Sequence, residues 1–232
     1  MAEALKHIAL LVRVPQGDAQ LKKEKKFEEL LISLQKSLKH DHVSLEIVAY
    51  RQHIYFYVYI PFHIVELVEG QIYSLYPDCE IVRTQDYVYD ALLKSLALAG
   101  AELRFKRSDI YSFKTYPAFE GDALASLFSV LTKGEKQDQA WVQMVIHPIE
   151  DTWWFNFRRL WKIRLRRIKS FFRIKNWFKS GNISKVENDA IEKKTHKDYF
   201  CLSLKLAYLS DSQAKANQRL RALVEAFSPF NT

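Results

Sequence analysis

Hydrophobic positions in residues 1–90 follow two alternating periods. Apolar residues recur at every second position in some stretches, which is typical of strands, and at every third or fourth position in others, which is typical of helices. These patterns predict, in chain order, a strand at 7–14, a helix at 27–38, strands at 43–47 and 54–60, a helix at 61–75 and a strand beginning at 79–83. The order βαββαβ is that of a ferredoxin-like unit.

The same order starts again in residues 91–232, where it is interrupted. The pattern predicts strands at 101–105 and 111–116, a helix at 122–134, strands at 141–147 and 200–206, and a last helix at 211–227. Between the last two strands, where a tight hairpin is expected, the chain carries an insertion at 151–198. We therefore predict an α+β protein of two tandem ferredoxin-like units, 1–90 and 91–232, the second containing the insertion and lacking its last strand.

The missing strand has a structural consequence. A ferredoxin-like sheet without it has an open edge, and the helix at 211–227 is left with part of its apolar face uncovered. We expect that the chain is part of something longer whose next segment supplies the strand. The alternative is that an edge strand comes from elsewhere, for example from Tyr87 to Tyr89.

The insertion contains the segment with the most unusual composition, Trp153 to Lys179. Its sequence, WWFNFRRLWKIRLRRIKSFFRIKNWFK, has nine aromatic residues and ten Lys or Arg, with no acid, Gly or Pro. The remaining 25 Lys and Arg of the chain face 27 acids, so the net charge of +8 comes from this segment. Large aromatic side chains disfavour exposure and cations disfavour burial, so we expect a partner with an apolar part and an anionic part.

Wound at 100° per residue, the segment is predicted to form an amphipathic helix with a kink near Ser170, followed by a second short helix. An apolar stripe centred on Trp161 runs along one side, and Lys and Arg lie beside it. The residues that we predict to bind a membrane or another anionic partner are Trp153, Trp154, Phe157, Arg158, Arg159, Trp161, Lys162, Arg164, Leu165, Arg166, Arg167, Ile168, Lys169, Phe172, Arg173, Lys175, Trp177 and Lys179. This pattern is typical of a helix lying in the interface of an anionic membrane.

The segment is not expected to cross the bilayer. Its longest apolar run, Trp153 to Phe155, is far shorter than the roughly 20 residues that span a membrane. The N-terminal run Ile8 to Val12 is too short for the core of a signal peptide, so we expect a cytoplasmic protein peripheral on the inner face of the cell membrane. Three alternatives remain open: the stripe packs on the protein's own sheet, the segment binds nucleic acid, or it binds a groove of another protein.

Catalytic signatures are absent from the sequence. The phosphate-binding pattern GxxxxGK[ST] is missing, no HExxH motif is formed, and His40 with His42 flanks Asp41 in a predicted surface turn. Cys79 and Cys201 lack metal-ligand spacing and are expected to be small buried residues. We therefore predict no enzyme activity, cofactor or metal site in this chain.

Three tyrosines alternate along the predicted strand at 54–60, on the face opposite its apolar residues. Tyr55, Tyr57 and Tyr59 are placed as base-stacking aromatics are in RNA-recognition sheets, but the surrounding glycine and basic pattern is missing. Tyrosine also favours strands, so we expect these rings to pack against the second unit or a partner.

Four stretches carry a resemblance to a known family: SLEIVAYRQHIYFYVYIP (44–61), VEGQIYSLYPDCEI (68–81), AGAEL (99–103) and KTYPAFEGDALASL (114–127). They resemble the N-terminal region of bacterial type IV secretion and conjugation ATPases, motors of the HerA/FtsK class common in ultrasmall candidate-phylum bacteria. In that family the region precedes a P-loop motor domain near the membrane. The resemblance implies membrane-proximal placement in a DNA or protein transfer machine, with a C-terminal or separately encoded motor domain as partner. Together with the missing catalytic motifs, this predicts a non-catalytic scaffold. Nucleic acid and a second copy of the chain are further possible partners.

Overall fold

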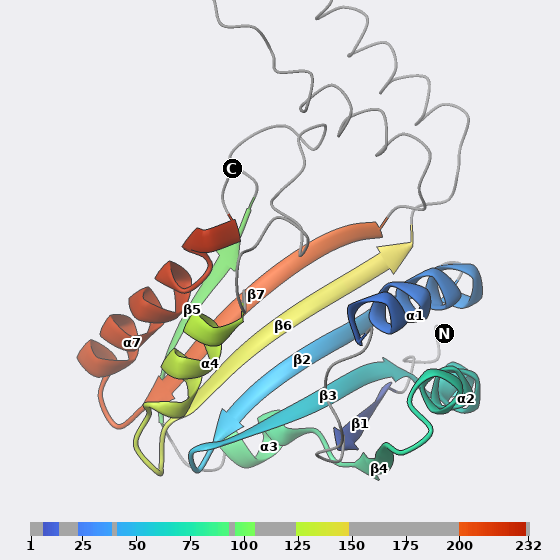
Figure 1. The fold of residues 1–232 in the computed structure, drawn as a ribbon. Helices are drawn as coiled ribbons and strands as arrows, with labels where there is room; N and C mark the ends of the chain where they lie inside the picture. Colours follow the sequence, from blue (N-terminus) through green and yellow to red (C-terminus); the bar gives the residue numbers. More distant parts are fainter. Residues whose placement is uncertain are drawn as a thin grey trace, which may run out of the picture. The chain divides into compact units, whose positions relative to one another are not determined.

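The protein is an α+β structure built on one seven-stranded antiparallel sheet (Figure 1). The computed structural model describes residues 7–13, 23–38, 41–92, 96–104, 124–148 and 200–230. The strands are β1 (His7–Arg13), β2 (Val43–Tyr50), β3 (His53–Pro61), β4 (Glu80–Thr84), β5 (Ala97–Leu103), β6 (Gln139–Pro148) and β7 (Phe200–Ser210). The α-helices within the described ranges are α1 (Lys23–Leu38), α2 (Val65–Leu75), α3 (Tyr87–Leu92), α4 (Ala125–Thr132) and α7 (Gln213–Glu225), with short 3-10 turns η1 (Phe62–Ile64) and η3 (Ser228–Phe230).

The strand order is β4-β1-β3-β2-β6-β7-β5. The first four strands of the chain therefore lie on one side of the sheet and the last three on the other. The two groups are joined by the pairing of β2 with β6, which runs from Val43↔Ile146 to Tyr50↔Gln139. All described residues belong to one compact unit, and the strands of both halves form one sheet.

Strand alternation divides the sheet into two faces. On one face, α1 and α2 cover the half that contains β1 and β3 (Figure 1). The central residues of this core are Leu10 on β1, Leu34 on α1, Ile60 on β3 and Val68 on α2, all at most 1% exposed. Helices form here because apolar residues recur at helical spacing and find this apolar sheet face to pack on.

The same face of the other half is covered by α4 and α7 (Figure 1). Leu127 of α4 and Leu223 of α7 are almost completely buried against Val142 of β6 and Leu206 of β7. Ala216, also fully buried, lets α7 approach the sheet closely. The predicted apolar stripe of the last helix is thus confirmed, and its partners are β5 and β7.

The opposite face of the sheet carries α3. Tyr87 and Val88 pack there against Val48, Trp141 and Leu209. The prediction that Tyr87 to Tyr89 supply an edge strand is therefore wrong, because these residues are helical. Asp86 accepts a hydrogen bond at 2.9 Å from the backbone N–H of Val88, which satisfies a free donor at the start of the helix.

The remaining predictions concern the other strands and helices and the two cysteines, and some of them are confirmed. The strands and helices predicted for residues 7–84 are present, and the two-residue turn at Arg51 and Gln52 is confirmed. Cys79 is buried as expected, but Cys201 is exposed because it lies on the face of β7 away from the helices. The strand expected at 111–116, the start of the helix expected at 122 and the insertion at 151–198 lie outside the described residues.

The shared sheet predicts that both halves lose their structure together. We expect Leu34→Ala in α1 and Leu223→Ala in α7 each to lower the free energy of unfolding by about 2–5 kcal/mol, since each removes a fully buried side chain. Urea unfolding followed by circular dichroism measures this loss, and amide hydrogen exchange reports each half separately. Ile32→Ala, on an exposed position of α1, is the matched control and should change the free energy by less than about 1 kcal/mol. Two separate transitions would contradict the coupling of the halves through the shared sheet.

Candidate functional site

The strands that flank the insertion pair with each other along their full length. The β6–β7 ladder runs without a break from Gln139↔Leu209 to Pro148↔Phe200. The sheet is therefore complete up to the point at which the chain leaves it. We call this point, the paired ends Pro148 and Phe200 with their neighbours, the insertion root.

All of the predicted membrane-binding residues, from Trp153 to Lys179, lie outside the described residues. The structure therefore places the root and not the segment itself. Between Pro148 and Trp153 the sequence holds only residues 149–152, so the start of the basic aromatic segment is tied closely to the end of β6.

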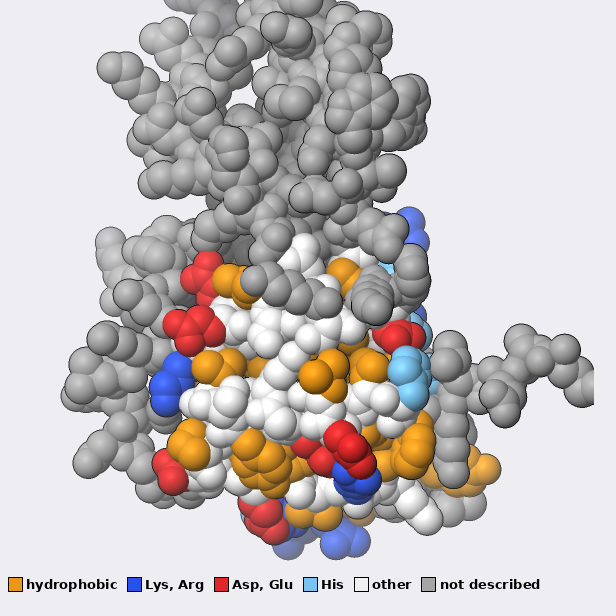
Figure 2. All heavy atoms as spheres, turned by 90° about the vertical axis from the view of Figure 1, so that its right-hand side faces the viewer, with side chains coloured by type: hydrophobic (Ala, Val, Ile, Leu, Met, Phe, Trp, Pro, Cys, Tyr) orange, Lys and Arg blue, Asp and Glu red, His pale blue; other side chains and the backbone are white. Residues whose placement is uncertain are grey.

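A histidine cluster lies at the same end of the sheet as the insertion root. It consists of His7 on β1, His42 before β2, His63 in η1 and His147 on β6, together with Asp41. Figure 2 shows histidine side chains grouped beside an acidic side chain on this surface. His147 pairs across the ladder with Cys201, one position from the last pair, so the cluster touches the root directly.

Asp41 connects the members of the cluster. Its carboxylate oxygen Oδ2 lies 2.9 Å from Nε2 of His63. Its backbone carbonyl lies 3.2 Å from Nδ1 of His147, and because a carbonyl only accepts, this ring nitrogen donates. The rings of His7 and His42 are 5.1 Å apart, and His7 stacks on Tyr59 at 5.2 Å.

Partial burial and the neighbouring imidazoles favour the neutral form of His42. The pKa of His42 is lowered, first by burial of its ring and then by the nearby His7 and His147, while Asp41 acts in the opposite direction. The polar turn predicted around Asp41 thus also forms hydrogen bonds with His63 of η1 and His147 of β6. Among the described residues, no group of three or more His, Cys, Asp or Glu is arranged to hold a metal ion.

A second polar site lies beneath α3 on the face opposite the main helices. Glu46 of β2 is only 7% exposed, and its Oε2 accepts a hydrogen bond of 2.7 Å from the hydroxyl of Tyr87. Gln143 of β6 donates to the same hydroxyl at 2.9 Å. Burial raises the pKa of the Glu46 carboxyl, and it also raises the pKa of the Tyr87 hydroxyl. These contacts fix α3 to the two strands that join the halves of the sheet.

The tyrosines of β3 fall on this same face, as predicted. Tyr57 packs against Tyr87 with ring centroids 5.1 Å apart, and Tyr55 lies 6.5 Å from Tyr57. Tyr59 stacks on His7 instead. All three rings therefore have ring partners within the protein, which favours packing over base stacking.

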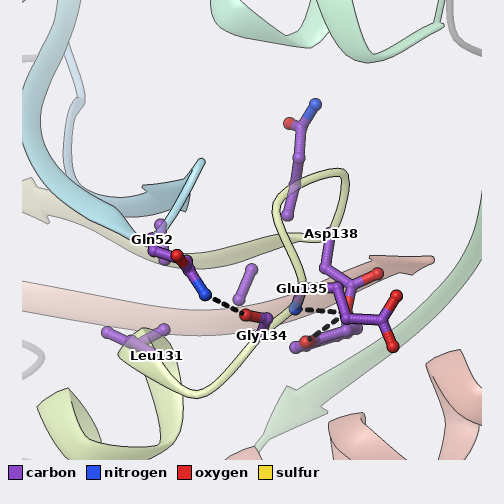
Figure 3. Close-up of a pocket in the computed structure, with 9 residues that line it drawn as sticks. Gln52, Leu131, Gly134, Glu135 and Asp138 are labelled. Carbon is purple, nitrogen blue, oxygen red and sulfur yellow. Dashed lines mark hydrogen bonds between the residues drawn. The ribbon is translucent and has the colours of Figure 1, made fainter.

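A third site surrounds Asp138 in the loop between α4 and β6 (Figure 3). Asp138 is 4% exposed and accepts hydrogen bonds from the hydroxyls of Ser210 at 2.8 Å and Tyr208 at 3.1 Å, and from the backbone N–H of Glu135 at 3.0 Å. Gln52 donates to the carbonyl of Gly134 at 3.2 Å and so ties the β2–β3 turn to this loop. The cavity here measures about 10 Å³, enough for roughly one water, so the arrangement is structural.

An open depression of about 550 Å³ lies beside this loop, at the end of the sheet away from the root. Tyr50, Arg51, Lys136 and Gln137 line it, and the Arg51 guanidinium lies over the Tyr50 ring at 5.1 Å. Arg51 and Gln52 both have positive φ, 51° and 63°, which is the geometry of a tight hairpin turn usually made with Gly or Asn. The basic lining is compatible with an anion, although the depression is wide and shallow.

Sequence reasoning found the insertion but not the histidine cluster. Its members come from four elements, and only His42 stands next to Asp41 in the sequence. The signal was present in the strand pattern, because His7 and Tyr59 fall on the same face once β1 and β3 pair. Recognising the cluster requires the order of the strands in the sheet, which cannot be read from the sequence alone.

Glu46 generates a prediction about pH. Burial raises the pKa of its carboxyl in the folded protein. Between the pKa of the unfolded chain and this raised pKa, the native protein keeps a proton that the unfolded chain has released. Stability is therefore highest at acid pH as far as this group is concerned, and is lost as pH rises through the raised pKa. We expect Glu46→Gln, which keeps the shape and removes the charge, to be more stable than the wild type above that pH and equal to it below. Urea unfolding over a pH series measures the difference.

The control for this prediction is Glu80→Gln. Glu80 pairs with Arg13 on the surface, where both side chains are more than half exposed, so its loss should change stability by less than about 1 kcal/mol. A wild type that becomes more stable than Glu46→Gln as pH rises would show that the buried carboxylate is stabilised as a charge.

Comparison with known proteins adds a family without an assigned activity. No curated protein matches the chain. A family model described as "Domain of unknown function (DUF8128)" matches residues 2–232, which is nearly the whole chain. By this match, the chain belongs to the DUF8128 family.

Proposed function

We propose that this chain is a non-catalytic interaction module that attaches to an anionic membrane surface through its basic aromatic insertion. The module lies on the inner face of the cell membrane and serves as the scaffold of a secretion-type or conjugation-type ATPase. The motor domain itself is C-terminal to the module or separately encoded.

One observation carries the proposal: the pairing of β6 with β7 continues without a gap up to Pro148 and Phe200, the residues between which the insertion lies. A hairpin with this register needs only a short turn, whereas the chain places residues 149–199 between the strands. A segment that the sheet does not require for its hydrogen bonds, and that holds the excess positive charge of the chain, is suited to an external partner.

The composition of the segment favours lipid among the anionic partners. Trp and Phe insert into the boundary between headgroups and acyl chains, and Lys and Arg lie over acidic headgroups. Each such cation contributes roughly 1 kcal/mol near an anionic surface. Among the described residues, no helix combines the length and the apolar character needed to cross a bilayer.

Two buried carboxyl groups that accept hydrogen bonds within the protein also support a non-catalytic role. Glu46 is covered by α3, and Asp138 is occupied by hydroxyl and backbone donors beside a cavity of water size. Neither is free to approach a substrate. The described carboxyl groups with the deepest burial therefore hold the fold together.

We further infer that the sheet consists of two ferredoxin-like units that meet through β2 and β6. In support, the order β4-β1-β3-β2 with α1 and α2 on one face has the arrangement of a complete βαββαβ unit. The order β6-β7-β5 with α4 and α7 repeats its first three strands in mirror order across the junction. The position next to β5 corresponds to the fourth strand of such a unit.

The test is binding to vesicles of phosphatidylcholine with and without phosphatidylglycerol, measured by co-flotation in low salt. We expect the wild type to float with the anionic vesicles. A variant in which Asn-Gly replaces residues 149–199 should stay unbound, and the register of Pro148↔Phe200 allows this short turn to close the hairpin. Equal flotation of the two proteins would contradict the proposal.

Point variants separate lipid from nucleic acid as the partner. Replacing Trp161, Leu165 and Ile168 together by Ser should weaken lipid binding by about a hundredfold or more, because each change removes on the order of 1 kcal/mol or more of apolar burial. Nucleic acid binding should instead depend on Arg158, Arg159, Arg166 and Arg167 and fall steeply with salt. If the Ser changes unfold the protein, as judged by circular dichroism, the stripe packs on the protein itself.

A further inference from the structure

The two outermost strands of the sheet differ in how they are protected from pairing with another chain. Among the described strands, these are β4 and β5 (Figure 1). β4 has only five residues, and two of them, Glu80 and Arg83, are charged and form ion pairs. Short length and charge are common means of protecting an edge strand. β5 is longer, with seven residues, ALAGAEL, and Glu102 is its one charged residue. β5 therefore lacks the protection that β4 has.

The backbone of β5 presents hydrogen-bonding groups on the side away from β7. The carbonyl oxygen of Leu206 on β7 is directed at its ladder partner Ala101, since it lies 3.7 Å from the position that a Cβ at Gly100 would take. Along an antiparallel strand, successive residues turn their N–H and C=O groups to opposite sides. The residues of β5 that turn these groups outward are therefore Leu98, Gly100 and Glu102. In agreement, the Leu98 carbonyl accepts a hydrogen bond of 3.1 Å from the Gln213 side chain of α7.

Gly100 is the least protected point of this edge. Its φ is not positive, and the β5–β7 ladder continues past it without a bulge. A Cβ there would make only ordinary van der Waals contact, so packing within the described part of the chain does not require a glycine. Glycine weakens a strand and often marks a place where another backbone approaches closely. Gly100 is also exposed, and because it has no side chain, the exposed atoms belong to the backbone.

A second copy of the same strand is complementary to this edge. If two β5 strands pair antiparallel about a two-fold axis at Ala101, the N–H and C=O of Gly100 on each copy bond to Glu102 of the other. The hydrogen bond from Gln213 to β5 is kept in this register. Each Glu102 then lies opposite a glycine and not opposite another Glu102, and its charge is already compensated by Arg104 at 2.6 Å.

We propose that the β5 edge is a self-association surface, through which two copies of the chain join their sheets by antiparallel β5–β5 pairing. The second copy takes the place beside β5 that β4 takes beside β1 in the first half of the sheet. Every copy carries the same edge, and this edge is complementary to itself, as a two-fold interface requires. The contact is one strand wide, so the dimer forms reversibly and depends on protein concentration. It does not depend on membrane attachment.

The first experiment measures the mass of the full chain by sedimentation equilibrium, from micromolar to submillimolar concentration. We expect the wild type to rise from 27.3 kDa toward twice this value. Gly100→Pro should weaken association about tenfold or more, because the ring replaces an outward N–H and projects into the contact. The hydrogen bonds between β5 and β7 are untouched by this change, since the N–H of Gly100 does not point to β7. Circular dichroism checks the fold of the variant.

A disulfide test does not depend on whether the strand tolerates proline. In the proposed register, Ala101 faces Ala101 of the second copy in a pair without mutual hydrogen bonds, where Cα atoms lie about 4.5 Å apart and a disulfide can form. With Cys201→Ser removing the exposed native thiol, Ala101→Cys should give a covalent dimer on mild oxidation. Leu98→Cys is the matched control. This position is more exposed than Ala101 but has no identical residue opposite it, so it should cross-link far more slowly.

Three results would overturn the proposal. The first is a wild type that stays monomeric over the whole concentration series. The second is a dimer that persists in folded Gly100→Pro, which would place the contact on another surface. The third is cross-linking of Leu98→Cys as fast as that of Ala101→Cys, which would indicate random collision. Vesicle flotation reports membrane attachment separately, so failure of self-association leaves the proposed function standing.

Discussion

The antiparallel pairing of β2 with β6 is the interaction on which the rest of the structure depends. It turns two sets of strands, each with its own pair of covering helices, into one sheet. Residues from both strands contribute to every apolar cluster near the junction: Ile146 packs with the first half, Ala49 with the second, and Val48 with Trp141 on the opposite face. Loss of this pairing would expose apolar surface on both faces at once.

The same junction determines what lies at each end of the sheet. Because β2 and β6 run antiparallel in register, the start of β2 meets the end of β6, which brings Asp41 and His42 to the insertion root. At the other end, the β2–β3 turn meets the loop before β6, where Gln52 contacts Gly134 and Asp138 holds its hydroxyl donors. One end of the protein is thus fixed by a buried network, and the other carries exposed titratable groups beside the insertion.

Much of the fold follows from the hydrophobic pattern, and the exceptions have physical causes. Alternating apolar residues identified β1, β2, β3 and β6 because one face of each strand packs under helices. The short helix α3 was missed because Tyr87, Val88 and Tyr89 favour strands. Tertiary contacts override that preference: the Tyr87 hydroxyl bonds to Glu46, its ring lies 5.2 Å from Trp141, and Asp86 caps the helix. The histidine cluster could not be predicted from spacing, since its members are distant in sequence and meet only through the strand order.

The unbroken β6–β7 ladder also has a consequence for how this protein can change over evolutionary time. The entropy lost on closing a loop grows only with the logarithm of its length, so a tenfold longer connection costs roughly 2 kcal/mol. A ladder that extends from Gln139↔Leu209 to Pro148↔Phe200 offsets such a penalty with its own hydrogen bonds and packing. The hydrogen bonds of this ladder therefore impose no fixed length on the connection between Pro148 and Phe200. A change in the length of this connection is thus expected to cost the fold less than the loss of one buried core side chain.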